Sequence, residues 1–201
     1  DRLIVCNKPS GLLTVPGKDP SLADCLEARV QARHPDRPAT KVVHRLDKDT
    51  SGLIVLAYGK PALGALGSQF EHRKVAKYYT ARVWGDVDGD TGLVDLPLAT
   101  DWENKPRQRV DHERGRPSRT EWQVLARERG VTRMKLIPLT GRTHQLRVHM
   151  IAIGHPILGD SFYAPPDALA AAERLQLHAE MLGFFHPTDG EWREFVAPAP
   201  F

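Results

Sequence analysis

The chain has 201 residues, 41% of them hydrophobic, so it is long enough to bury a sizeable core as one domain or as two closely joined lobes. It contains no run of about 18 uncharged apolar residues and its N-terminus lacks the pattern of a signal peptide, which argues against a membrane-spanning helix and against secretion. The formal net charge of +3 and the pI of about 9.0 are mildly basic, and by themselves they do not identify a nucleic-acid partner.

The two cysteines indicate the compartment. Cys6 and Cys25 are far apart in the sequence and make no Cys-x-x-Cys pattern. We therefore expect two free thiols in a reducing cytoplasm, without a disulfide.

The N-terminal third begins with a short strand and a helix. Residues 3–6 are apolar and predict a strand, and residues 7–11 have the composition of a turn. Ser21 followed three residues later by Asp24 is an N-terminal capping pattern. We expect a helix that begins at Ser21 and ends at His34.

The segment 42–57 holds the densest cluster of polar groups between two apolar runs. Residues 42–43 and 53–57 predict buried strands, and the seven polar residues between them are His44, Arg45, Asp47, Lys48, Asp49, Thr50 and Ser51. A polar segment held between buried strands can position a carboxylate precisely, and Arg45 could keep Asp47 ionised. Taken alone, the same pattern is also typical of a local salt bridge or a turn anchor.

A second amphipathic helix is predicted over residues 60–72, followed by an aromatic strand that basic residues precede. Strand alternation places Tyr79, Ala81 and Val83 on one face. A tyrosine there could stack on a base, although a tyrosine in a strand is more often simply part of the core.

Residues 102–119 contain six lysine or arginine residues against three acids, with no helical or strand periodicity. They predict an exposed basic loop in which Lys105, Arg107 and Arg109 could contact RNA phosphates. An ordinary solvated loop is the alternative.

Residues 120–127 and 131–139 predict a hairpin turned at Arg129 and Gly130. Thr143 is then expected to cap a helix that stops at Gly154, with His144 and Arg147 on one face. His149 lies about 140° around this helix from His144, so the two cannot readily bind one metal, and a zinc site is disfavoured. A short helix near residues 167–174 and a final hairpin, residues 177–182 and 191–197, complete the predicted elements.

Three motifs resemble those of the RluA-type pseudouridine synthases. They are His-Arg-Leu-Asp-x-x-Thr-Ser-Gly at residues 44–52, Lys-x-Tyr-x-Ala-x-Val-x-Gly at residues 77–85, and Gly-Arg-Thr-His-Gln-Leu-Arg-x-His at residues 141–149. The Leu-His-Ala and Phe-x-His-Pro segments near the C-terminus also match the family pattern. The resemblance runs from Asn7 to about residue 197, so it covers essentially the whole chain.

The resemblance implies a role for each motif. It makes Asp47 the catalytic residue, places Tyr79 against the target base, pairs Arg147 with the catalytic carboxylate, and lets Arg45 enter the space that a flipped uridine vacates. The further substrate-binding residues that we expect in the same motifs are His44, Lys77 and Arg142.

The fold that the resemblance implies is α+β, a large mixed but mostly antiparallel sheet flanked by helices with a central active-site cleft. Residues 1–201 would form a single catalytic domain of two closely joined lobes, without an S4-like RNA-binding domain. The implied activity is isomerisation of specific uridines to pseudouridine, by base flipping, in loops of large-subunit rRNA and in a tRNA anticodon stem-loop. We expect RNA as the partner, no membrane, no metal, no cofactor, and a monomeric cytoplasmic protein.

Several alternatives stay open at this stage. The synthase could act on rRNA only or at another tRNA site, and Asp47 could attack the sugar C1′, attack the base, or remove a sugar proton to give a glycal. A non-catalytic RNA-binding module would explain the basic loop and the aromatic strand. A nucleoside hydrolase would need a second carboxylate, for which Asp49 is the near candidate.

Overall fold

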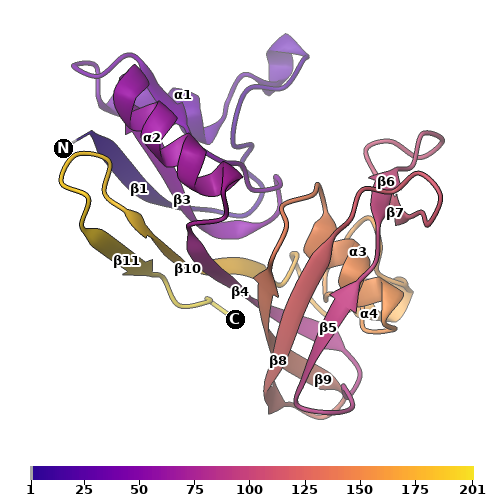
Figure 1. Cartoon of the computed structure of the whole chain (residues 1–201). Helices are drawn as coiled ribbons and strands as arrows, with labels where there is room; N and C mark the ends of the chain where they lie inside the picture. The colour runs from indigo at the N-terminus through magenta and orange to yellow at the C-terminus, as the bar shows by residue number, and fades with distance from the viewer. Residues whose placement is uncertain (1) are drawn as a thin grey trace. The chain divides into compact units, whose positions relative to one another are not determined.

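The computed structural model describes residues 2–201 and divides into two compact units. Unit 1 contains the chain up to Lys77 together with His178–Pro200, and unit 2 contains Tyr78–Leu177 with Phe201. The chain passes between them within the long strands β4 (Ala76–Trp84) and β10 (Leu177–Phe185) (Figure 1).

Unit 1 is built around one buried strand. β3 (Ser51–Tyr58) is buried along its length except at its last residue, and β1 (Leu3–Lys8) pairs antiparallel with its whole length on one edge. On the other edge it pairs antiparallel with β2 (Thr40–Val42) and then parallel with β10 (Leu177–Phe185), which in turn pairs with β11 (Trp192–Val196). The apolar run predicted as a buried strand is therefore confirmed.

The pairing of β3 explains where the polar motif emerges. Val42 is the last residue of β2 and lies opposite Leu56, whereas Ser51 begins β3 opposite His178 of β10. Residues 43–50 therefore leave the sheet where the edge of β3 changes partner, and they return at its first residue. A loop tied at both ends to a buried strand has little freedom to move.

Two helices complete unit 1, and α2 (Lys60–Glu71) confirms the predicted amphipathic helix. Its buried residues Ala62 and Leu66 pack against β3 in the core of this unit. The core cluster consists of Leu53, Val55, Ala57, Ala62, Leu66, Leu182 and Phe184.

The prediction that a helix begins at Ser21 is wrong. The structure has a single 3₁₀ turn, η1 (Pro20–Leu22), and a separate helix, α1 (Leu26–Arg33), whose N-cap is Cys25. The reason is tertiary: Leu13 and Thr14 accept the first backbone N–H groups of α1 through their carbonyls. These acceptors hold residue 25 extended and fix the helix start five residues beyond Ser21.

Unit 2 contains four antiparallel strands in the order β4, β9, β8, β5, namely β4 (Ala76–Trp84), β9 (Val131–Pro138), β8 (Arg119–Arg127) and β5 (Thr91–Asp95). The predicted hairpin is confirmed, because β8 and β9 pair and their turn holds Arg129 and Gly130 with positive φ. The predicted apolar face of β4 is confirmed as well. Ala81 and Val83 lie in the core of this unit, and Tyr79 packs against it.

The longer helix of this unit, α3 (Gln145–Ala152), begins later than predicted. Thr143 does not cap it, because His144 occupies the N-cap position with a left-handed φ of 52° and no side-chain capping bond. Leu146 and Met150 of α3 join the core on β4 and β9. Burial of that face, rather than a cap, sets the position of the helix.

Two further predictions need correction. The basic segment 102–119 is not loop throughout, since β7 (Gln108–Val110) pairs with β6 (Leu98–Thr100) in a separate two-stranded ribbon (Figure 1). The helix near residues 167–174 is shorter, α4 (Pro166–Ala170), and ends at its C-cap Ala171. The α+β class with mixed, mostly antiparallel strands is confirmed.

Candidate active site

The segment that carries Asp47 is held first by Thr14. The Thr14 hydroxyl donates to the Leu46 carbonyl at 2.7 Å and accepts from the Leu46 N–H at 3.2 Å. The Leu46 side chain is buried. The residue immediately before Asp47 is therefore fixed by its backbone and by its side chain.

Lys8 holds the other side of Asp47. Its side chain is fully buried, and Nζ donates to the carbonyls of Pro9, Leu12 and Lys48 at 2.8–2.9 Å. Burial lowers the pKa of Lys8 to about 8, and the carboxylates of Asp49 and Asp47 oppose that shift. Lys8 therefore pins the loop just after Asp47 and carries a positive charge whose field reaches that carboxylate.

The side chains of this loop differ in their exposure to solvent. Asp47 is half-buried, whereas Arg45 and Lys48 are exposed. Ser10 donates its hydroxyl hydrogen to the Asp49 carbonyl at 2.7 Å, which adds another tether from the turn after β1. The backbone is thus rigid, while Arg45 extends into solvent.

His44 and Lys77, both predicted to bind substrate, gather around Phe70 at the end of α2. The rings of His44 and Phe70 stack with centroids 4.4 Å apart, and Val55 donates its N–H to His44 Nε2 at 3.3 Å. Lys77 Nζ lies 5.7 Å from the Phe70 centroid. Burial and the nearby Lys77 lower the pKa of His44 to about 3, so the ring is neutral, and burial also lowers the pKa of Lys77.

Arg147 in unit 2 is buried and paired with Asp160. Its Nε and Nη2 donate to the two carboxylate oxygens at 2.8 and 2.6 Å, and the two side chains are 2% and 1% exposed. Asp160 also accepts the N–H groups of Phe162 and Tyr163, whose rings lie 4.9 and 5.2 Å from the guanidinium. The plane of the guanidinium is fixed by this bidentate pair.

Gln145 organises the turn that precedes α3. Its Oε1 accepts from the Thr140 hydroxyl and from the Arg142 N–H, while Nε2 donates to the Arg119 carbonyl and to Thr120 Oγ1. His144 Nδ1 makes a 2.7 Å hydrogen bond with the Tyr163 hydroxyl. The half-buried Arg142 is therefore held on a turn that a buried amide braces.

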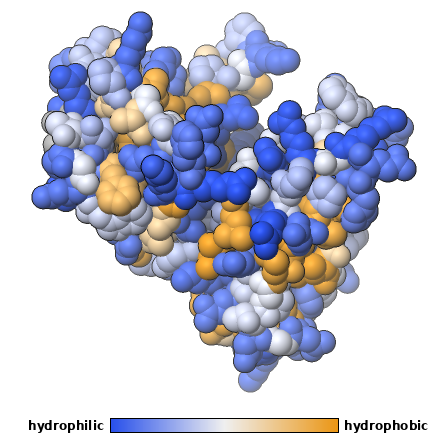
Figure 2. All heavy atoms as spheres, viewed as in Figure 1, coloured by the Kyte–Doolittle hydropathy of each residue, from blue (hydrophilic) through white to orange (hydrophobic). Residues whose placement is uncertain are grey.

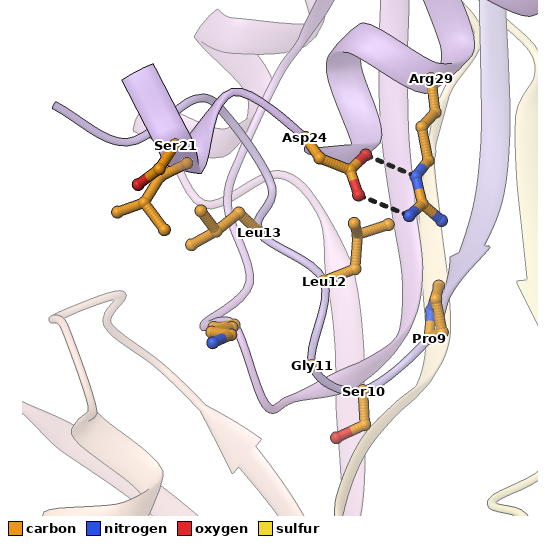
Figure 3. Close-up of a pocket in the computed structure, with 10 residues that line it drawn as sticks. Pro9, Ser10, Gly11, Leu12, Leu13, Ser21, Asp24 and Arg29 are labelled. Atoms are coloured by element: carbon orange, nitrogen blue, oxygen red, sulfur yellow. Dashed lines mark hydrogen bonds and ion pairs between the residues drawn. The ribbon is translucent and has the colours of Figure 1, made fainter. Parts of the chain in front are cut away.

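An open pocket of about 380 Å³ in unit 1 lies beside the Asp47 segment. It is lined by the turn 9–13, by Leu22 and the Asp24–Arg29 ion pair, and by Lys48 from the motif (Figure 3). Asp47 does not line it. The pocket reaches the candidate site only through Lys48.

The sequence matches the family model described as RNA pseudouridylate synthase over residues 2–152. The chain belongs to this family. Asp47, Tyr79 and Arg147 all fall within the matched residues, and the predicted enzyme class, an RNA pseudouridine synthase, is confirmed.

Curated relatives match across the full chain. Proteins named "Dual-specificity RNA pseudouridine synthase RluA" share 53% identity in Yersinia pestis, over 99% of this chain and 96% of the relative. The protein of that name from Escherichia coli (strain K12) shares 52%, over 100% and 91%. That from Vibrio vulnificus (strain CMCP6) shares 50%, over 100% and 81%.

Solved structures agree with the fold. "Human RNA Pseudouridylate Synthase Domain Containing 1" superimposes with a TM-score of 0.82 at 31% identity, covering 100% of this chain and 81% of the other. "Human RNA Pseudouridylate Synthase Domain Containing 4" gives 0.78 at 26% identity, covering 99% and 86%.

The structure distributes the predicted residues of this synthase over both units. Unit 1 holds His44, Arg45, Asp47 and Lys77. Those in unit 2 are Tyr79, Lys105, Arg107, Arg109, Arg142 and Arg147. The ion pair between Arg147 and Asp47, and the position of Tyr79 over the base, stay predictions.

Sequence reasoning missed three supports of this synthase. Lys8 lies within residues 2–152, which match the family model, so that match was an available signal, whereas Asp160 lies beyond the matched residues. Thr14 gave no signal, because its partner Leu46 is 32 residues away.

Two absences hold for the described part of the synthase, one concerning metal ions and one concerning membranes. Within residues 2–201, no group of three or more His, Cys, Asp or Glu side chains is arranged to hold a metal ion. None of the helices over those residues is both long enough and apolar enough to cross a bilayer. Cys6 and Cys25 are free thiols, as predicted.

Proposed function

We propose that this synthase isomerises specific uridines to pseudouridine in loops of large-subunit rRNA and in a tRNA anticodon stem-loop, with Asp47 as the catalytic residue. The observation that carries the proposal is a carboxylate on a segment anchored at Leu46, Lys48 and Asp49. The dual-specificity relatives, at 50–53% identity over nearly the whole chain, support the choice of RNA.

Asp47 must be ionised for each route that pseudouridine formation could follow. Attack on C1′ or on the base needs a nucleophilic carboxylate, and abstraction of a sugar proton needs a basic one. Lys8 and Asp47 attract each other, and this attraction opposes the fall in the pKa of Lys8 that burial causes. The anchored backbone keeps the carboxylate in one direction while the base detaches and turns.

Arg147 is the proposed ion-pair partner of Asp47. Asp160 accepts hydrogen bonds from Nε and Nη2 of Arg147. This contact fixes the plane of the guanidinium and therefore the direction in which its other edge faces. A guanidinium fixed in this way can bind a second carboxylate with defined geometry. Asp160 would then act as the positioning residue for that contact.

The target uridine must leave its stack to reach Asp47, at a cost of a few kcal/mol that is smallest in a loop. Arg45 is exposed, so its long side chain can fill the vacated space, and Tyr79 would stack on the flipped base. His44, whose ring is neutral, would bind around the nucleotide together with Lys77 and Arg142. The basic ribbon with Lys105, Arg107 and Arg109 would contact phosphates.

The uracil leaves C1′ and must rejoin the ribose through C5 before water intervenes. We expect this to need neither metal nor cofactor, and we expect a monomer acting in the cytoplasm. Free thiols at Cys6 and Cys25 support a reducing compartment.

Tritium release from RNA labelled at uridine C5 tests the proposal, because C5 loses its hydrogen when it becomes the glycosidic carbon. Wild type and Asp47→Asn would be assayed on bulk rRNA and bulk tRNA that lack the modification. Release by wild type from both RNAs, with none by Asp47→Asn and no free uracil, is expected.

Other results would point elsewhere. Release from one RNA class alone would leave an rRNA-only or a tRNA-only synthase. Free uracil would indicate a hydrolase, with Asp49 as the second carboxylate. Binding by wild type and by Asp47→Asn without any release would indicate a non-catalytic RNA-binding module.

A further inference from the structure

The tip of the β6–β7 ribbon is a closed, hydrogen-bonded turn. Asp101 donates its N–H to the Arg107 carbonyl at 3.0 Å, and Arg107 donates its N–H to the Asn104 carbonyl at 2.9 Å. Asn104 Nδ2 returns to Asp101 Oδ2 at 2.9 Å, and this bond lowers the pKa of Asp101. The tip between the two strands therefore has one defined shape, although its surroundings are solvent.

Trp102 stands on this tip with 73% of its surface exposed. It is the most exposed large hydrophobic side chain among residues 2–201, and the next most exposed, Val196, is at 56%. Tryptophan is ordinarily well buried, because its indole carries a large apolar area. A tryptophan presented to solvent on an ordered turn offers an open aromatic face on which a planar group can stack.

Lys105 covers one face of the indole. Its Nζ lies 3.9 Å from the ring centroid, a close cation–π contact. This contact orients the ring, and the exposed area of Trp102 shows that much of the indole stays open to solvent. The ring is thus held ready for a flat ligand.

Three exposed cations lie near Trp102 in the sequence of this ribbon. Lys105, Arg107 and Arg109 are all exposed on the ribbon, and the surface there is largely hydrophilic in Figure 2, in the region where Figure 1 draws β6 and β7. Three acids accompany them: Asp111 binds Arg109 at 3.2 Å and also accepts backbone N–H groups, Asp101 accepts from Asn104, and Glu103 is exposed. Three cations therefore balance three acids here, so the tip offers individual Lys and Arg contacts to phosphates and no net positive field.

We propose that Trp102 is a base-stacking residue that binds an unpaired nucleotide of the RNA substrate outside the target uridine. The inference rests on the proposed function, which supplies RNA with loops as the substrate. A planar aromatic flanked by exposed cations matches the chemistry of single-stranded RNA, in which unpaired bases stack on aromatic rings while Lys and Arg hold phosphates. Stacking would fix the register of the loop on this ribbon.

Stacking and phosphate contacts have different signatures, which makes the inference testable. Removing a phosphate contact lowers the slope of log K against log salt, because fewer counterions are released. Removing a stacked aromatic weakens binding without changing that slope. A surface cation–π pair with only a structural role would change neither quantity.

The experiment measures the Kd for a hairpin RNA with unpaired uridines in its loop, over a series of salt concentrations, and tritium release from the same RNA. Full-length Trp102→Ala, Trp102→Phe and the control Trp192→Phe are compared; Trp192 is 40% exposed in β11. Thermal unfolding confirms that each variant folds. We expect Trp102→Ala to weaken binding at least about fivefold with an unchanged salt slope. Trp102→Phe should retain most of the affinity, and the control should match wild type.

Tryptophan fluorescence gives a second readout on the same proteins. Stacking on a base should quench Trp102, so RNA should quench wild type and the Trp192→Phe control more than Trp102→Phe. Equal affinity of Trp102→Ala and wild type would overturn the inference, and so would a Phe variant as weak as the Ala variant. If wild type binds the hairpin but releases no tritium, the proposed function fails while the binding test of Trp102 still stands.

Discussion

Arg147 and Asp160 form a buried bidentate ion pair, 13 residues apart in the sequence and both at least 98% shielded from solvent. Removing one partner of such a pair leaves an uncompensated charge in the interior, which is far more costly than never having had the pair. The two residues therefore depend on each other for stability as well as for orientation.

Asp160→Asn should destabilise the protein by about 3–5 kcal/mol and should sharply lower tritium release. The loss follows because the amide cannot neutralise Arg147, so the guanidinium loses both its charge partner and its fixed plane. Urea unfolding and single-turnover tritium release check the two effects. The matched control is Asp24→Asn, which breaks the exposed pair with Arg29 and should leave both quantities near wild type.

Lys8 should make stability depend on pH in the alkaline range. Its pKa is about 8 in the folded protein against 10.5 in the unfolded chain, so between these values the unfolded chain binds more protons. Stability contributed by this group therefore rises as pH increases from about 8 to 10.5. The free energy of unfolding of wild type minus that of Lys8→Met should grow over this window.

At neutral pH the same Lys8→Met variant should be less stable than wild type by about 2–4 kcal/mol, because three buried carbonyls lose their donor. Urea unfolding at several pH values measures both effects. A constant difference between the two proteins from pH 7.5 to 10.5 would show that Lys8 has an ordinary pKa.

His44 should stay neutral well below the usual range of histidine. Its pKa is about 3 in the folded protein against 6.5 for the unfolded chain, so stability contributed by His44 is complete above pH 6.5 and decreases as pH falls toward 3. The ring resonances of His44 in an NMR titration should not move between pH 8 and 5. A His44 midpoint near 6.5 would contradict the desolvated, stacked ring.

Charge reversal of Arg107 and Arg109 should weaken RNA binding and reduce its salt slope. Both side chains are exposed on the β6–β7 ribbon, and removing one phosphate interaction lowers the slope by about 0.7–0.9. Filter binding over a salt series measures this. Arg193→Glu, on exposed β11, is the matched reversal. If Arg107→Glu with Arg109→Glu behaves like this control, the ribbon does not contact the phosphates.

The family, the residues proposed to act and most of the strands could be predicted from local patterns in the chain. Asp47, Tyr79 and Arg147 lie in contiguous motifs, and the buried strand β3, the hairpin turn at Arg129 and Gly130 and the helix α2 follow from local periodicity and turn chemistry. These features depend on neighbours within about ten residues, so a linear pattern can encode them.

Which groups meet across long distances in the chain could be known only from the three-dimensional fold. Lys8 binds the carbonyl of Lys48 across 40 residues, and Asp160 binds Arg147. Other contacts between separate segments displaced a predicted boundary. The carbonyls of Leu13 and Thr14 moved the start of α1 from Ser21 to Leu26. A buried polar group takes whichever partner the fold brings within about 3 Å, and that choice is made by packing and not by spacing along the chain.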